Sequence, residues 1–243
     1  MMSEDKKCAA DNTKIAGEKT ISDWKKLREN LLPDKEFNEE DWEKAFDDYF
    51  IQRLETRYFR PIQELDKIKE NTGEGFSIVT IYCSLIEFLQ SMREGKIYKY
   101  AEKDEKIEDP YYSDAGDMFK RFLITQKPIE KWIKSGKNDC NKYAQDFYKN
   151  VRCALIHEAR TKGNWKILVS TKHEKEYSNL PIDFGNTKIF RDKLCGAFNE
   201  YLANYRREIL NKSRQNLRIA FIIKFDNLAD LPIDGKLITQ SGS

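Results

Sequence analysis

The chain has 243 residues, of which 40% are hydrophobic and 35% are charged, with 11 glycines and 6 prolines. This length fits one large domain or one domain with extensions, and we favour the second. The composition disfavours a disordered chain or a β-sandwich, so we expect a soluble, mainly α protein. The formal net charge of +2 excludes a uniformly basic protein, and five cysteines without paired spacing disfavour a disulfide framework or a zinc site.

Neither a membrane span nor a signal peptide is predicted. No apolar run approaches the roughly 20 residues that a spanning helix needs. The segment Met1–Lys19 is polar and mixed in charge, so it lacks the apolar core of a signal peptide. We therefore expect a cytoplasmic protein that makes no contact with a membrane.

The amino-terminal part contains one short predicted helix. Residues up to about Thr20 are expected to form a loose tail. Ser22 is placed to cap a helix that continues through Leu32, and Pro33 would end it.

A long amphipathic helix is predicted to start at Asn38. Apolar residues recur at every fourth position from Trp42 to Tyr58 and form one stripe. Pro61 should kink or break this helix before it resumes to about Glu70.

The most apolar segment is Phe76–Arg93, which we expect to be the central helix of a bundle, with Gly95 in the helix-stop position. The charged segment Lys96–Tyr112 is predicted to be an exposed connection. A shorter helix is predicted over about Ser113–Thr125, and another helical turn near Pro128.

Asn138 or Asp139 can cap the next helix, which is predicted to run to about Arg160 and to stop near Gly163. The stretch Trp165–Val169 then favours a short edge strand or an extended flap.

The last long helix is predicted to start at Asn186 and to run through Leu210, and Asn216–Leu228 can be either strand or helix. We therefore divide the chain into a tail with a short helix (1–37), a helical domain (38–210) and a C-terminal extension packed on the same domain (211–243).

Arg152 and His157 lie five positions apart in an apolar, helical run, and the chain has only 2 histidines. At about 100° per residue, one face of this helix points toward the core, and Arg152 and His157 flank the opposite face. The predicted core face consists of Tyr143, Phe147, Val151, Ala154 and Leu155. The predicted outward face carries Cys153, Ile156 and Arg160, and suggests a contact with another part of the chain or with a second copy.

This pair suggests a chemistry. Imidazole can move a proton near neutral pH, and a guanidinium group can neutralise the charge that develops on phosphorus. Cleavage of RNA by its own 2′-hydroxyl needs both groups and requires no metal. Residues 120–175 carry 14 Lys/Arg against 5 Asp/Glu, so the basic half of the chain contains the Arg152/His157 pair. The alternative is that both residues are packed on a helix without a catalytic role.

The run Phe147–Trp165, with Arg152, four intervening residues and His157, resembles the HEPN superfamily, whose signature is an arginine, four to six residues and a histidine on the last helix of a four-helix bundle. The segment Ile81–Gln90 is similar to an earlier core helix of that family. The resemblance covers roughly residues 38–210.

The resemblance implies a HEPN-like four-helix bundle with extra N- and C-terminal helices. It also implies a homodimer in which both copies contribute Arg152 and His157 to one cleft, with metal-independent endoribonuclease activity of a defence or toxin type. His157 would then be the general acid or base and Arg152 the phosphate clamp, while Lys149 and Arg160 would attract the RNA backbone. No cofactor is implied, and an antitoxin or defence protein is a candidate partner.

Three further residues are candidates for a supporting role. They are Glu87, Asn150 and Cys153. Glu87 is either the partner of a cation or an exposed helix residue. Cys153 departs from the family pattern, because many active members have asparagine or aspartate directly after the arginine, so it bears on the rate of cleavage.

Two other functions stay open. One is a HEPN bundle without catalysis that serves as a nucleotide- or RNA-binding or interaction module, and the other is a helical scaffold in which Arg152 and His157 secure a dimer seam. His173 is expected in a solvated loop. The four tryptophans are expected in the core or as caps, with base stacking as the alternative for Trp165.

Overall fold

A computed structural model describes residues 11–68, 73–102, 105–134, 139–171 and 180–241. The chain forms two compact units, and neither is continuous in sequence. Unit 1 comprises residues 1–56, 91–113 and 207–243, and unit 2 comprises residues 57–90 and 114–206. The domain boundaries expected at 37/38 and 210/211 stay predictions.

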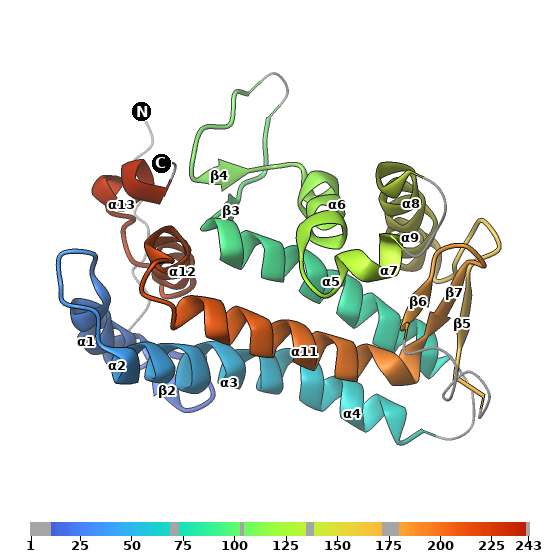
Figure 1. The fold of residues 1–243 in the computed structure, drawn as a ribbon, viewed down its shortest axis with the longest axis horizontal. Coiled ribbons are helices and arrows are strands. Elements are labelled where there is room, and N and C mark those ends of the chain that lie inside the picture. The colour runs from blue at the N-terminus through green and yellow to red at the C-terminus, as the bar shows by residue number, and fades with distance from the viewer. Residues whose placement is uncertain (1–10, 69–72, 103–104, 135–138, 172–179, 242–243) are drawn as a thin grey trace. The chain divides into compact units, whose positions relative to one another are not determined.

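Both units are mainly helical, which confirms the predicted fold class at this level (Figure 1). The elements in unit 1 are β1 (Lys14–Ala16), β2 (Lys19–Thr20), α1 (Ile21–Leu31), α2 (Glu39–Lys44), the π-helix η1 (Ala45–Ile51), α3 (Gln52–Leu54), β3 (Ile97–Tyr98), β4 (Tyr111–Tyr112), α12 (Gln215–Leu228) and α13 (Gly235–Ser241). The elements wholly or mainly in unit 2 are the π-helix η2 (Glu55–Phe59), α4 (Arg60–Asp66), α5 (Glu74–Glu94), α6 (Ala115–Thr125), α7 (Glu130–Lys134), α8 (Cys140–Phe147), the π-helix η3 (Tyr148–Cys153), α9 (Ala154–Glu158), β5 (Lys166–Leu168), β6 (Ile182–Asp183), β7 (Lys188–Phe190) and α11 (Arg191–Ile209).

The start of unit 1 differs from the sequence prediction. Residues 14–20 form an antiparallel hairpin, β1–β2, instead of a loose tail. Thr20 caps α1 in place of Ser22, because its hydroxyl accepts from the backbone N–H of Asp23 while the Asp23 carboxylate accepts from the backbone N–H of Thr20. This reciprocal capping box begins the helix two residues earlier than a Ser22 cap would.

The core of unit 1 forms where α1 meets α12. Trp24 is fully buried against Phe225, with 4.9 Å between ring centroids, and its indole N–H donates to Asp226 at 3.0 Å. Arg28 donates to both carboxylate oxygens of Asp226 at 2.8 Å. The ambiguous segment 216–228 is a helix, α12, and α1 packs against it.

The long helix after Asn38 begins as predicted, since the Asn38 side chain accepts from the backbone N–H of Glu40 at 3.0 Å. Pro61 does not break it, because helical elements follow one another without a gap from Glu39 to Asp66. Pro61 lies in the first turn of α4, directly after the π-helix η2, where the hydrogen-bond register changes and a missing N–H costs less than in a regular helix interior.

α5 contacts several other elements of unit 2, and its role as the central helix of a bundle stays a prediction. Tyr82 stacks on Phe198 of α11 with 4.9 Å between ring centroids. Gln90 accepts a hydrogen bond from Gln126, the residue that follows α6, at 3.1 Å. Glu87 forms an ion pair with η3 that belongs to the candidate site below.

α5 is long and apolar enough to cross a membrane, which corrects the expectation that no apolar run approaches that length. In its most apolar window, 56% of the residues are buried inside the structure. A buried apolar helix of this length is typical of a protein core, so α5 is weak support for a membrane span, and the cytoplasmic location stays a prediction.

The carboxyl-terminal half of unit 2 contains a three-stranded sheet with the strand order β5–β7–β6. β5 is an edge strand, as predicted from Trp165–Val169, and it pairs in parallel with β7. The helix expected from Asn186 starts later, because residues 188–190 pair as β7 and α11 begins only at Arg191. All four tryptophans are buried, as predicted: Trp24, Trp42, Trp132 and Trp165.

Candidate functional site

The helical run that carries Arg152 and His157 consists of α8, η3 and α9. Asp139 caps it by accepting from the backbone N–H of Asn141 at 2.8 Å, as predicted, whereas Asn138 lies outside the described residues. The predicted core face is buried at Phe147, Val151, Ala154 and Leu155 and half-buried at Tyr143. The helix ends at Glu158, earlier than expected, because Ala159 adopts a left-handed conformation with φ of 52°.

Arg152 lies in a polar setting that joins two helices of unit 2. Its guanidinium Nη2 is 3.4 Å from the carboxylate of Glu87 on α5, and the two side chains are 20% and 19% exposed. The guanidinium also lies over the ring of Tyr148, 5.5 Å from the ring centre. Glu87 is therefore the partner of a cation, which was one of its two predicted readings, and enough exposure remains for an anion to approach Arg152.

His157 has different surroundings. Its side chain is exposed in the last turn of α9, and no described residue forms a hydrogen bond or an ion pair with it. Within the described part of the chain, His157 and Arg152 form no hydrogen bond with one another either. One copy of the chain thus has an accessible imidazole at His157. About one and a half turns earlier on the helix, its Arg152 guanidinium already pairs with Glu87.

The two predicted backbone-attracting residues also differ. Lys149 is exposed and no described acidic residue pairs with it. Arg160 is exposed but pairs with Glu158 at 3.3 Å, and Lys162 pairs with the same carboxylate. The hydrogen bond from Lys162 is the main reason why the pKa of Glu158 lies below its usual value, and the hydrogen bond and charge of Arg160 add to this effect.

Asn150 connects the helix to the turn that follows it. Its side-chain amide donates to Asp146 at 2.7 Å, and its carbonyl accepts from the backbone N–H of Lys162 at 2.8 Å. The second oxygen of Asp146 accepts from the indole N–H of Trp165 at 2.7 Å. Trp165 packs edge-on against Phe147, so it is a core residue and does not present a face to a base.

Sequence reasoning missed Asp146 and Tyr148. The spacing of four between Asp146 and Asn150 was a signal for their hydrogen bond. Tyr148 lies four positions before Arg152, so the same spacing was a signal for the contact between its ring and the guanidinium.

Cys153, the residue that departs from the family pattern, is half-buried beside Tyr148. Burial raises the pKa of Tyr148 to about 12, against the lowering effect of Arg152 and with a raising effect of Cys153. Burial likewise raises the pKa of the Cys83 thiol on α5 to about 12. Both groups are therefore neutral at physiological pH, which leaves Arg152 and Glu87 as the charged pair of this site.

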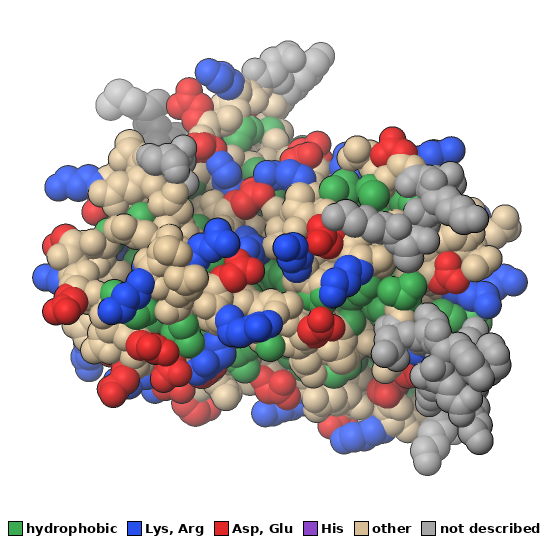
Figure 2. Space-filling view, viewed as in Figure 1, with side chains coloured by type: hydrophobic (Ala, Val, Ile, Leu, Met, Phe, Trp, Pro, Cys, Tyr) green, Lys and Arg blue, Asp and Glu red, His purple; other side chains and the backbone are tan. Residues whose placement is uncertain are grey.

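The described residues contain no cluster of three or more histidine, cysteine, aspartate or glutamate side chains that could hold a metal ion. His173 lies outside the described residues. On the face of the molecule in Figure 2, basic and acidic side chains are interspersed, in keeping with the net charge of +2.

Comparison of the chain with protein-family models, with curated proteins and with solved structures found no match in any of the three.

Proposed function

We propose that the chain is a HEPN-like, metal-independent endoribonuclease of a defence or toxin type that acts as a homodimer in the cytoplasm. The observation that carries this proposal is the exposed His157, with which no described residue pairs, on the same helical run as a partly exposed Arg152. An imidazole that no described group holds is free to exchange a proton with a substrate.

In the proposed reaction, the 2′-hydroxyl of a ribose attacks the adjacent phosphorus. His157 acts as the general base for this hydroxyl or as the general acid for the leaving 5′-oxygen. Arg152 binds the non-bridging oxygens, whose negative charge grows in the transition state. The bond to the 5′-oxygen breaks, and the products end in a 2′,3′-cyclic phosphate and a 5′-hydroxyl.

Glu87 then acts as a stand-in for the substrate. Its carboxylate oxygen Oε2 accepts a hydrogen bond from Nη2 of Arg152 at 3.4 Å, a distance that is long for a charge-assisted hydrogen bond. A phosphate with a better geometry can displace it, while the ring of Tyr148 keeps the guanidinium in place. Lys149 is the nearby exposed lysine that we assign to the RNA backbone, and Arg160 contributes less because Glu158 partly neutralises it.

The direct test is cleavage of total cellular RNA by the purified protein in EDTA, with analysis of the product ends. We expect cyclic phosphate ends from the wild type and none from Arg152→Ala or His157→Ala proteins of unchanged fold and mass. The Arg60→Ala protein is a matched control, because Arg60 is an exposed arginine of unit 2 on α4, outside the basic segment 120–175. Cleavage that depends on added magnesium, or that survives both substitutions, contradicts the proposal.

The ion pair between Arg152 and Glu87 favours one second candidate, a non-catalytic nucleotide- or RNA-binding or interaction module. In that case, the pair joins α5 to η3 and no cleavage occurs. RNA binding that survives His157→Ala, with no cleavage by the wild type, identifies this second function.

A further inference from the structure

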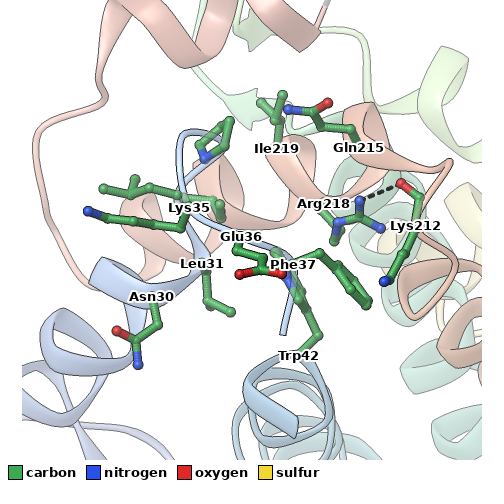
Figure 3. Close-up of a pocket in the computed structure, with 13 residues that line it drawn as sticks. Asn30, Leu31, Lys35, Glu36, Phe37, Trp42, Lys212, Gln215, Arg218 and Ile219 are labelled. Carbon is green, nitrogen blue, oxygen red and sulfur yellow. Dashed lines mark hydrogen bonds between the residues drawn. The ribbon is translucent and has the colours of Figure 1, made fainter. Parts of the chain in front are cut away.

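Unit 1 contains a cavity of about 190 Å³ between the end of α1, the turn that follows it and the first turns of α12 (Figure 3). We call it the Arg218 pocket. Its lining includes Leu31, Phe37, Trp42, Lys212, Arg218 and Ile219. The lining is thus partly apolar and partly cationic, and it contains one carboxylate, that of Glu36.

Arg218 is a buried cation without a described counterion. Only 7% of the residue is exposed, and its guanidinium donates to the carbonyls of Ile209, Asn211 and Lys212 at 3.1, 2.5 and 2.8 Å. These carbonyls are neutral, and within the described residues no carboxylate lies within ion-pair distance. Three bonds leave two of the five guanidinium N–H groups uncommitted. Burial lowers the pKa of Arg218, which shows the cost of a buried charge that has no anion.

Lysines and a helix end add positive potential to the same pocket. Lys212 Nζ lies 5.6 Å from the ring centre of Phe37, and the Arg218 guanidinium lies 4.7 Å from the same ring centre. Lys35 also lines the cavity. α12 starts at Gln215 without a side-chain cap, so the positive end of a 14-residue helix lies at the pocket too.

Size and the neighbouring charges limit the ligand. A dry cavity of roughly 150 Å³ holds benzene, so this one accommodates about one ring with one polar group. A second cavity shares Lys35, Glu36 and Phe37 with the pocket and adds Glu39 and Asp41 to its lining. Glu36, which lines both cavities, and the acids Glu39 and Asp41 of the second cavity repel a polyanion such as RNA more strongly than a ligand with a single negative group.

We propose that the Arg218 pocket binds a small organic anion with one carboxylate or phosphate group on an apolar ring or chain. The anionic group accepts hydrogen bonds from Arg218 and Lys212, and the apolar part packs on the floor that Leu31 and Ile219 form. This binding function is separate from the proposed RNA cleavage and does not rest on it.

The test is isothermal titration calorimetry of the full chain with four probes: benzoate, phenyl phosphate, their neutral analogue benzamide, and inorganic phosphate. We expect benzoate or phenyl phosphate to bind at least about tenfold more tightly than benzamide, because only an anion compensates the buried guanidinium. The stronger of the two identifies the carboxylate or the phosphate as the natural group.

Two substitutions locate the site without removing Arg218, whose bonds to three carbonyls support the fold. Lys212→Ala removes one cation, and Gln215→Glu adds a negative charge that the start of a helix tolerates well. Each should weaken binding by about tenfold, whereas Lys26→Ala, an exposed lysine of α1 that does not line the pocket, should not. Three results overturn the proposal: no binding of either organic anion, equal binding of benzamide or inorganic phosphate, or binding that both pocket variants retain.

Discussion

Gly163 lies in the turn after the site helix and packs closely against Asn150 on that helix. Its φ is +58°, and a Cβ built there would lie 2.7 Å from Nδ2 of Asn150. That amide is already bonded to Asp146, so it cannot move without losing the bond. We predict that Gly163→Ala lowers the free energy of unfolding by about 1–3 kcal/mol, measured by denaturant titration.

Gly196 provides the matched control. It lies inside α11, and a Cβ there meets nothing within 4 Å. Gly196→Ala should therefore stabilise the protein by about 0.5–1 kcal/mol, because alanine favours a helix more than glycine does. Equal effects of the two substitutions would show that the left-handed turn at Gly163 is not required.

Glu87 and Arg152 allow a second test at the residue scale. Glu87→Gln removes the carboxylate charge while keeping nearly the same shape, so Arg152 becomes available to a phosphate. If RNA binds at Arg152, its affinity should rise by about threefold to tenfold at low salt, and the gain should shrink as ionic strength increases. Fluorescence anisotropy with a labelled RNA measures this.

The control is Glu200→Gln, which removes an exposed charge on α11 of the same unit. A general loss of negative charge would raise RNA affinity equally in both variants. Only a larger effect of Glu87→Gln supports Arg152 as the phosphate-binding residue.

At the scale of elements, the capping box of α1 makes stability depend on pH. The hydrogen bonds from the backbone and the side chain of Thr20 lower the pKa of Asp23 from its ordinary value of 3.8. A carboxyl group with a lowered pKa in the folded state stabilises the protein above its unfolded pKa, and this contribution is lost as pH falls through the folded pKa. Asp23→Asn should therefore lower the melting temperature at pH 7.

The difference between Asp23→Asn and the wild type should shrink as pH falls below 3.8, because a protonated aspartate resembles asparagine. Thermal melts followed by circular dichroism measure this. Glu29→Gln, at an exposed position of the same helix that pairs with no described residue, should show no such pH-dependent difference. A constant difference across the pH range would mean that the charge of Asp23 has no part in the cap.

Helical periodicity and some of the caps could be predicted because they depend on neighbours in sequence, whereas the cap of α1 was assigned to Ser22 and is Thr20. The start at Asn38, the cap at Asp139 and the buried stripe of Phe147, Val151 and Leu155 follow from spacing alone. The π-helical segments could not, since a π turn depends on packing around it and has no local sequence signal that we could use. The turn η3 is one of them, and it includes Arg152 itself.

Contacts between distant residues were the other part that sequence could not supply. Glu87 and Arg152 are 65 positions apart, and either could have paired elsewhere or faced solvent. Trp24 and Asp226 are 202 positions apart, and nothing local links an indole on α1 to an acid on α12. The candidate site was therefore predicted as a pair of residues on one helix. That Glu87 is the counterion of Arg152 was one of two alternatives for Glu87, the other being an exposed helix residue.

At the scale of the whole molecule, the proposed function requires two copies of the chain to meet along the outward face of α9. Ile156 is 49% exposed on this face, next to His157, and an apolar side chain there would be buried in a dimer seam. Ile156→Asp would place a charge in that seam, so we expect a monomer in sedimentation experiments. We also expect a loss of RNA cleavage, because in the proposed function each cleft needs residues from both copies.

Val169→Asp is the control. Val169 is also 49% exposed, but it follows β5 and does not lie on α9, so this variant tests whether a charge at any exposed apolar position has the same effect. A wild type that is monomeric at micromolar concentration, or an Ile156→Asp protein that remains dimeric, would place the active unit elsewhere and leave the cleavage chemistry to a single copy.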